Sequence, residues 1–406
     1  MNQFEKVFCR TYQTAFRAAL PVLPYRRPKA LKNVGELSET LRAKQIKRVL
    51  IVTDAAITKL GLYEPLCRQL KSDGIRFYVY DRTVANPTTD NVEEALQLYH
   101  VSRCEAIIGF GGGSSIDCAK AVGARVACPN KPLSKMEGLL KICRRLPLLI
   151  AVPTTAGTGS ETTLAAVITD SKTRHKYPIN DFSLIPSYAL LDPDVTLGLP
   201  PHLTATTGLD ALTHAVEAYI GRSTTAGTRE DARQAVRLIF ENLPAAVQNG
   251  QNREARKCML YAAYLAGNAF TRSYVGYVHG IAHSLGGKYN IPHGYANAVL
   301  LPVVLEQYGA AAHRKLMELA VAAGLCEEGT VPSEGAAAFI EAVREMKRNF
   351  GIGDAFPELR REDIPELARY AAHECNPLYP VPVEMNAAEL EHLYELVLVK
   401  EKEEVA

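Results

Sequence analysis

The sequence lacks a marked excess of either charge, a long hydrophobic run and any closely paired cysteines. Its 406 residues carry a formal net charge of +2, so composition favours neither nucleic acid nor a membrane surface as a partner. No apolar run approaches the roughly 18–20 residues that span a bilayer. The nine cysteines are scattered without a CxxC pair, which favours reduced thiols in the cytoplasm over a disulfide framework or a zinc finger.

The first twenty residues differ in character from the rest. Their aromatic side chains recur at helical spacing: Phe4, Phe8, Tyr12 and Phe16. This spacing predicts a helix whose apolar stripe packs on the body of the protein. An arginine-containing amphipathic start with few acids would also fit a transit peptide, but we favour the packed helix. The proline-rich, basic stretch at 21–29 is expected to be a connector.

Short apolar runs alternate with amphipathic segments between about residues 46 and 153. The runs expected as strands are Lys47–Asp54, Arg76–Asp81, 105–110 and 148–153. Helices are expected over 55–73, after the turn at 86–89, and after residue 117. Continuous apolar strands alternating with helices are typical of a parallel sheet covered on both faces.

Beyond about residue 200 the strand pattern stops and a helical period takes over. Helices are expected over 208–220, 229–248, 252–272, 275–287, 296–308, 310–323, 332–350, 364–374 and 387–401. The sequence therefore predicts two domains. Residues 1–200 form an α/β domain, in which 1–34 are a helical and connecting extension, and residues 201–406 form an all-helical domain.

Two glycine-rich loops follow predicted strands. In the first, GGGSSID ending at Asp117, the missing side chains expose backbone N–H groups at a helix start, where a phosphate can bind. Its glycines are contiguous, unlike GxGxxG, and such a turn alone can be only a tight connection. The second, PTTAGTGSE ending at Glu161, offers hydroxyl groups for a phosphate or ribose, or simply caps a helix.

Asp54 ends the first predicted strand. A carboxylate there can accept hydrogen bonds from the adenosine ribose and would repel a 2′-phosphate, which favours NAD over NADP. Its alternative role is that of an ordinary turn residue.

Histidines gather in the stretch GYVHGIAHSLGGKYNIPHGYAN, residues 276–297. Helical spacing places His279 and His283 on one face, and does the same for Asp210 and His214 upstream. One carboxylate with several imidazoles is a ligand set for a divalent metal such as Fe(II) or Zn(II). The residues alone therefore predict a metal site in the helical half.

Taken together, the motifs closely resemble the iron-containing (group III) alcohol dehydrogenase family. The motifs that carry the resemblance are VTD54, NPT88, GGGSSID117, PTTAGTGSE161, LLDPDVT196, GLDALTHAVEAY219, HGIAHSLGG287 and PHGYANA298. The segment CNPLYPVP382 departs from the family's Asn-Pro-Arg pattern, since Leu378 stands in place of the arginine. The resemblance implies an N-terminal α/β dinucleotide-binding domain and an all-α C-terminal metal-binding domain, with metal and nicotinamide in the cleft between them.

Carried over position by position, the resemblance identifies the metal ligands as Asp210, His214, His279 and His293. It thus replaces His283 by His293 in the ligand set, and leaves His283 beside the metal as a catalytic residue on the substrate or nicotinamide side. The implied NAD contacts are Asp54, Asn86, Gly112, Gly113, Ser114, Asp117, Thr154, Thr155, Thr158, Thr163 and Lys176.

The expected function is reversible hydride transfer between a primary or small alcohol and NAD, assisted by one divalent metal. A metal-bound oxygen stabilises the alkoxide, or polarises the aldehyde in reverse. The resemblance favours Fe(II), with Zn(II) possible, and a homodimer or higher homo-oligomer. Alternatives are a glycerol or polyol dehydrogenase, a dehydroquinate-synthase-like enzyme on the same architecture, and a non-enzymatic scaffold.

Overall fold

The computed structural model describes residues 1 and 3–399 of the chain. They divide into two compact units, a sheet unit of residues 24–199 and 250–271 and a helical unit made of the remaining described residues. The chain crosses from one unit to the other next to the expected boundary at residue 200, but two segments depart from the expected linear domains. Residues 1–23 belong to the helical unit and 250–271 to the sheet unit.

Six parallel strands form the main sheet, in the order β1-β9-β6-β4-β2-β3. Their bounds are β1 Lys29–Leu31, β2 Arg48–Val52, β3 Arg76–Tyr80, β4 Ala106–Gly111, β6 Leu148–Pro153 and β9 Tyr188–Leu190. The four strands expected from apolar runs are confirmed. The neighbouring strands β1 and β9, at one end of the strand order, were not expected, because three residues are too few to show a period.

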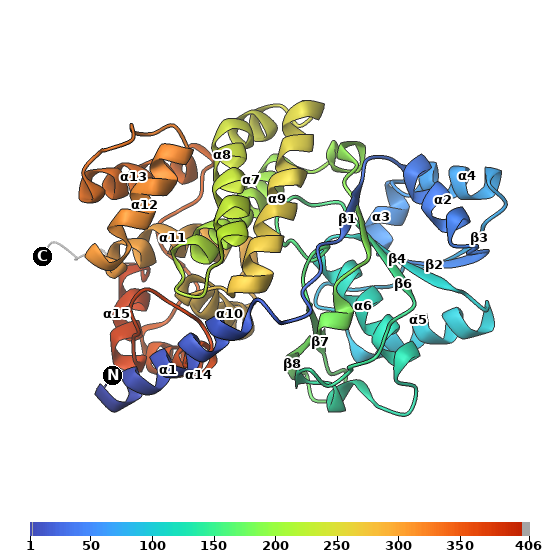
Figure 1. The fold of residues 1–406 in the computed structure, drawn as a ribbon, viewed down its shortest axis with the longest axis horizontal. Helices are drawn as coiled ribbons and strands as arrows, with labels where there is room; N and C mark the ends of the chain where they lie inside the picture. The colour runs from blue at the N-terminus through green and yellow to red at the C-terminus, as the bar shows by residue number, and fades with distance from the viewer. Residues whose placement is uncertain (2, 400–406) are drawn as a thin grey trace, which may run out of the picture. The chain divides into compact units, whose positions relative to one another are not determined.

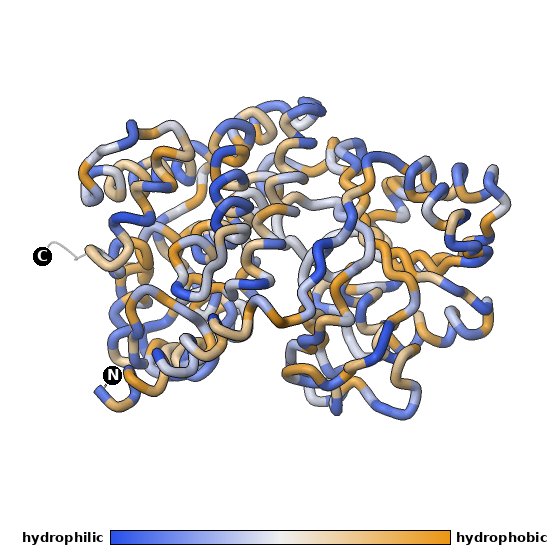
Figure 2. Tube along the Cα trace, viewed as in Figure 1, coloured by the Kyte–Doolittle hydropathy of each residue, from blue (hydrophilic) through white to orange (hydrophobic). Residues whose placement is uncertain are grey.

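The central strands are among the most hydrophobic segments of this unit (Figure 2). One face of the sheet packs Leu50 and Ile107 into a core cluster with helix residues such as Val122. The other packs Val49 and Ile108 into a second cluster. Burial on both faces explains why these strands are continuous apolar runs.

Along the chain, helices connect the successive strands of the main sheet from β1 to β6 (Figure 1). They are α2 Val34–Ala43, α3 Ala55–Lys59, α4 Glu64–Ser72, α5 Thr89–Val101 and α6 Gly113–Ala127. The single helix expected over 55–73 is two helices, because Gly61 adopts a left-handed φ of 64° between them. A second sheet, also not expected, contains β5 Gly138–Leu139, β8 Lys176–Asn180 and β7 Ala165–Thr169, in that order.

The 250–271 segment joins the sheet unit through α9, Arg253–Ser273. A side chain at Gly267 would place its Cβ atom 2.1 Å from Thr162 Oγ1 and 3.0 Å from the Gly159 backbone. Glycine at this position therefore lets the helix approach the loop after β6 closely.

The sequence pattern predicted the helices of the helical unit, as well as α9 of the sheet unit. Those of the helical unit after residue 200 are α7 Pro201–Ile220, α8 Ala226–Gln248, α10 Tyr277–Tyr289, α11 His293–Tyr308, α12 Ala310–Ala322, α13 Pro332–Asn349, α14 Ile364–Cys375 and α15 Ala387–Leu396. The last helix was expected to reach residue 401, but it ends at Leu396, and residues 397–399 are not helical. Residues 400 and 401 lie outside the described part of the chain. Within the described part of the chain, no helix is long and apolar enough to cross a membrane.

Helix α1, Gln3–Ala19, confirms the expected N-terminal helix, but the expected packing of its apolar stripe is wrong. Phe4 is 82% exposed and Phe8 56% exposed. The residues that α1 buries are Cys9 and Gln13. Polar contacts and the ring of Phe16, rather than the aromatic stripe as a whole, hold this helix on the helical unit.

Candidate metal centre and nucleotide-binding edge

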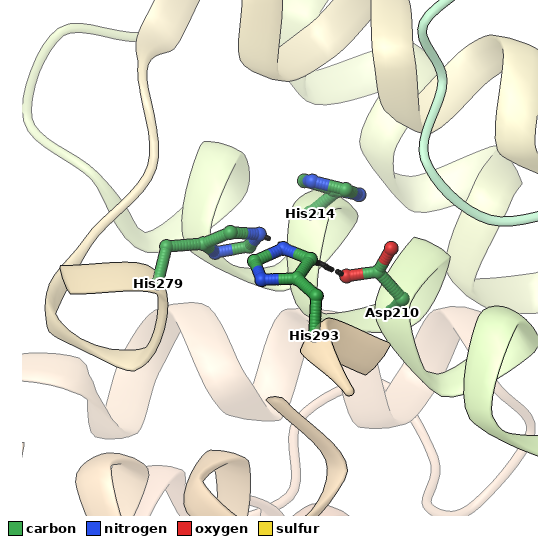
Figure 3. A group of neighbouring side chains, drawn as sticks. All are labelled: Asp210, His214, His279 and His293. Carbon is green, nitrogen blue, oxygen red and sulfur yellow. Dashed lines mark ion pairs between the residues drawn. The ribbon is translucent and has the colours of Figure 1, made fainter. Parts of the chain in front are cut away.

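Four potential ligands converge inside the helical unit (Figure 3). Asp210 and His214 lie one turn apart on the buried α7, His279 lies on α10, and His293 is the first residue of α11. One ligand atom from each residue lies within 4.8 Å of the others. The side chains therefore come from three helices, whereas helical spacing alone had suggested two.

His283 does not join this group. It lies one turn after His279 on α10, and its ring stacks on His293 with centroids 5.2 Å apart and an interplanar angle of 18°. Its Nδ1 atom lies 2.6 Å from Glu374 Oε1. The structure thus places His283 beside the four converging side chains, on the outer side of His293, where its own side chain is 44% exposed.

Two glycines allow close helix contacts around the ligands, one between α11 and α7 and one between α10 and α14. A Cβ atom on Gly294 would lie 2.6 Å from the Thr206 backbone oxygen, so only glycine lets the start of α11 approach α7 this closely. A Cβ atom on Gly280, next to His279, would lie 2.2 Å from Cys375 Sγ. The positions of the ligands therefore depend on two close helix contacts.

Glu217 orients His279, and the sequence reasoning missed it. Its Oε2 atom lies 2.6 Å from His279 Nδ1, while its two oxygens accept hydrogen bonds from the backbone N–H groups of Gly276 and Val278. A metal-ligating histidine commonly donates its second ring N–H to a carboxylate in this way. Asp210, His214 and Glu217 recur at i, i+4 and i+7 on α7, a spacing that would have predicted the contribution of Glu217.

Asn297 is a second residue that the sequence reasoning missed. Its Nδ2 atom donates to Asp210 Oδ1 at 2.7 Å and lies 3.2 Å from His279 Nε2 and 3.1 Å from His293 Nε2. Asn297 lies one helical turn after His293, fully buried. The carboxamide therefore touches three of the four converging side chains, and the i+4 spacing in PHGYAN was the signal.

The donor set fits a divalent metal ion. Burial, followed by the neighbouring imidazoles, holds the pKa of His279 well below its usual range, which keeps the ring neutral as a metal ligand must be. Ligand atoms at roughly 2.1 Å from a shared ion lie about 3.4 Å apart in tetrahedral geometry, so side-chain shifts of about 1 Å bring the observed 4.8 Å spread to a binding geometry. One carboxylate and three imidazoles suit Fe(II) and Zn(II).

The residues predicted to bind the nucleotide all lie in the sheet unit, and several of them follow the carboxyl ends of its strands. Asp54 follows β2, the Gly112–Ser114 loop follows β4, and Thr154 follows β6. Strand order reverses direction at β2 and β4, and open parallel sheets bind ligands where it does so. Asp54 caps α3 through Oδ1 and accepts a hydrogen bond from Ser115 through Oδ2, so it both shapes the turn and tethers the glycine loop.

Several of the predicted residues contact one another. Lys176 Nζ donates to Asn86 Oδ1 at 2.7 Å, and the Asn86 backbone N–H donates to Ser114 Oγ at 3.3 Å. The two glycine-rich loops also lie together, because a Cβ atom on Gly113 would lie 3.2 Å from Thr158 Cγ2, and one on Gly112 would lie 3.7 Å from Thr155 Oγ1.

Asp117 and Thr163 belong to a buried network rather than to the open edge. Asp117 accepts hydrogen bonds from Ser160 Oγ at 2.6 Å and from the Val167 backbone N–H at 3.0 Å. Thr163 Oγ1 accepts a hydrogen bond at 2.7 Å from Lys120, whose side chain is wholly buried. Their predicted role as cofactor contacts is thus accompanied by a structural one, holding the second loop against α6.

Comparison with known proteins covers both units. The profile described as iron-containing alcohol dehydrogenase matches residues 25–193, and that of the C-terminal region of the same family matches 204–398. The NAD-dependent methanol dehydrogenase of Bacillus methanolicus is 38% identical over 84% of this chain and 89% of its own length. The chain belongs to the iron-containing alcohol dehydrogenase family. The 1,3-propanediol dehydrogenase of Citrobacter freundii is 38% identical over 89% of this chain and 93% of its own length.

A solved structure of a 1,3-propanediol oxidoreductase has a TM-score of 0.88 to this chain at 34% identity. The alignment covers 92% of this chain and 98% of that one. Family, fold class and the interconversion of alcohols and aldehydes are therefore confirmed, as are the expected cofactor classes, NAD and a divalent metal ion. Residues 1–24 lie outside both family matches.

Proposed function

We propose that the protein oxidises a small primary alcohol, or reduces the corresponding aldehyde, with the metal ion held by Asp210, His214, His279 and His293. The observation that carries this proposal is the convergence of one carboxylate oxygen and three imidazole nitrogens within 4.8 Å. Iron is the favoured ion because the family description names it, while the donor set also accepts zinc. Such an ion supplies Lewis-acid stabilisation of a developing alkoxide or carbonyl.

The residues around the proposed ligands hold the site in its working form. Glu217 keeps the proton of His279 on Nδ1, so that Nε2 stays available as a ligand atom. Asn297 donates to Asp210 Oδ1 and thereby fixes the direction of that carboxylate. Burial of Asp210, His214 and His279 excludes water from their side of the site, and this strengthens every electrostatic interaction there.

NAD is the proposed hydride acceptor, and it binds at the carboxyl edge of the main sheet. The residues proposed to contact it are Asp54, Asn86, Gly112, Gly113, Ser114, Asp117, Thr154, Thr155, Thr158, Thr163 and Lys176. The helix start at Gly113 suits the pyrophosphate. The carboxylate of Asp54 disfavours a 2′-phosphate, which supports NAD over NADP.

His283 is the proposed catalytic residue that carries the substrate proton. With Nδ1 held by Glu374, the imidazole exchanges a proton through Nε2. Its exposed position beside His293 supports a path between the substrate oxygen and solvent. We further propose a homodimer or higher homo-oligomer that works in the cytoplasm.

A substrate panel on metal-defined protein tests the function. Ethanol, 1-butanol, 1,3-propanediol and glycerol are each offered with NAD and with NADP, after loading with Fe(II) or Zn(II). We expect NADH formation with primary alcohols in the iron-loaded form. Preference for glycerol would support the polyol dehydrogenase alternative, and inactivity in every combination would refute the proposal.

Two variants test the residue roles. His279→Ala should lose bound metal, measured by elemental analysis. His283→Ala should retain its metal but lower kcat on the order of 100-fold, the range expected for a lost general acid–base group. Unchanged kcat in His283→Ala would show that the proton follows another route.

A further inference from the structure

The N-terminal helix lies outside both family matches, yet it contacts a segment that leads directly to His283. That segment is 376–384, where the chain departs from the family's Asn-Pro-Arg pattern. All of the contacts that follow lie within the helical unit.

Polar side chains of α1 hold the backbone of this segment. Gln13 Nε2 donates to the carbonyl oxygen of Tyr379 at 2.9 Å and to that of Pro377 at 3.3 Å. Arg10 donates to the carbonyl oxygens of Val381 and Pro382, both at 2.8 Å. It also forms an ion pair with Glu384, whose side chain is almost wholly buried. An irregular segment must satisfy its backbone carbonyls somewhere, and here α1 satisfies four of them.

Aromatic rings form a second contact between α1 and the same segment. Phe16 lies edge-on to Tyr274 with centroids 5.1 Å apart, and Tyr274 lies 6.2 Å from the ring of Tyr379. Phe16 is the only member of the aromatic stripe whose ring is half-buried in the described structure; the others are exposed. The backbone and the ring of Tyr379 are therefore both fixed from the side of α1.

Tyr379 connects α1 to His283 through a shared contact with Glu374. Its hydroxyl donates to Glu374 Oε1 at 2.7 Å, and the same oxygen lies 2.6 Å from His283 Nδ1. A carboxylate oxygen shared between a tyrosine hydroxyl and an imidazole N–H fixes the tautomer and the plane of the imidazole. The order of contact is Gln13, Tyr379, Glu374 and His283.

We propose that Glu374 and Tyr379 are positioning residues for His283, and that α1 is the element that holds them in place. This inference rests on the proposed proton-carrying role of His283. The N-terminal extension then belongs to the substrate side of the active site, in a chain whose 376–384 segment has lost the family's arginine.

The first experiment does not depend on activity. Amide hydrogen exchange of the metal-loaded, full-length protein is measured over residues 376–384 in Gln13→Ala and in Thr14→Ala, an exposed neighbour on α1. Gln13→Ala should accelerate exchange at least severalfold, and Thr14→Ala should leave it unchanged. If Gln13→Ala folds poorly, Phe16→Leu serves as a second test of the contact between α1 and residues 376–384. Equal exchange in wild type and both probes would refute the role of α1.

The second experiment separates positioning from structure at Glu374. Glu374→Ala should lower kcat for 1,3-propanediol about tenfold, the usual size for loss of an orienting hydrogen bond, with metal content and the KM for NAD unchanged. Glu374→Gln keeps an oxygen acceptor and should recover most of the loss. If Glu374→Ala keeps wild-type kcat while His283→Ala does not, the positioning role is wrong.

The tautomer of His283 gives a readout that survives failure of the proposed function. In zinc-loaded protein with ¹⁵N-labelled histidine, the Nδ1–H form of His283 should dominate in wild type and in Glu374→Gln, and become mixed in Glu374→Ala. An inactive wild type would refute the proposed function alone, because the exchange and tautomer measurements still decide the inference.

Discussion

Alanine at position 280 should collide with the thiol of Cys375. The two residues join α10 and α14, and a Cβ atom built on Gly280 lies 2.2 Å from Cys375 Sγ. Non-bonded heavy atoms prefer about 3.5–4.0 Å, so one helix must shift by more than about 1 Å. The next contacts are ordinary, Ala371 O at 3.8 Å and Cys375 Cβ at 4.0 Å. The thiol alone therefore excludes a methyl group at position 280.

The magnitude follows from three terms. Overpacking of a buried contact costs about 1–3 kcal/mol, while replacing glycine by alanine inside a helix returns about 1 kcal/mol. Gly280→Ala should therefore lower the free energy of unfolding by about 1 kcal/mol, and by about 2 kcal/mol at most. Cys375→Ala leaves a small cavity and should cost about 1 kcal/mol. In the double variant the new methyl group occupies the space of the missing sulfur, so its stability should lie close to that of wild type.

Urea unfolding of the four proteins, followed by circular dichroism, measures the coupling. We expect a favourable interaction energy of about 2 kcal/mol, within the range found for residues in contact. Because His279 precedes Gly280, the single variant Gly280→Ala should also bind metal more weakly, and the double variant should recover that binding. Additive effects of the two substitutions would refute the reasoning, since they would show that the thiol does not limit the space at position 280.

Three further results are expected. Glu217→Gln should weaken metal binding about tenfold, measured by chelator competition, because a neutral amide holds the Nδ1 proton of His279 less firmly; unchanged affinity would exclude an orienting role. Lys120→Met should destabilise the protein by about 3 kcal/mol in urea, because it leaves buried acceptors unpaired, whereas the exposed Lys71→Met should have little effect. Burial raises the pKa of Glu161 to about 7 from an ordinary 4.5. Its folded form thus holds a proton that the unfolded chain releases between these values, and stability should fall by about 3 kcal/mol from pH 4.5 to 7; a fall of equal size in Glu161→Gln would contradict this assignment.

Long, continuous apolar runs made the core of the sheet predictable. The strands β2 and β4 are buried on both faces, and for this reason their residues form continuous apolar runs that can be recognised in the sequence. The strands β1 and β9 have three residues each, which is too short for a recognisable pattern. Their extended structure depends on the pairing between neighbouring strands. In the small sheet, β5 has only two residues, while β7 and β8 bury alternate residues and so show no continuous apolar run.

Helical periodicity identified the helices of the second half, but not what each helix contacts. The aromatic stripe of α1 has the spacing of a packed face, yet Phe4 and Phe8 are exposed. Carbonyls of residues 377–382 accept hydrogen bonds from the polar Arg10 and Gln13 instead. The sequence pattern shows which residues are hydrophobic. It does not show that backbone carbonyl groups more than 350 positions away need hydrogen-bond donors from α1.

By itself, the sequence determined the parallel-sheet core, the run of helices and the kinds of side chain that can hold a divalent ion, because hydrophobic period and residue chemistry are local properties. Helical spacing alone paired His279 with His283, and the family motifs supplied His293 in place of His283. Only the tertiary structure showed that Asp210, His214, His279 and His293 converge, that Glu217 and Asn297 contact them, and that α1 reaches the segment beside His283. Those facts depend on how closely α11 approaches α7 at Gly294 and α10 approaches α14 at Gly280, and such distances are set by packing between segments far apart in the chain.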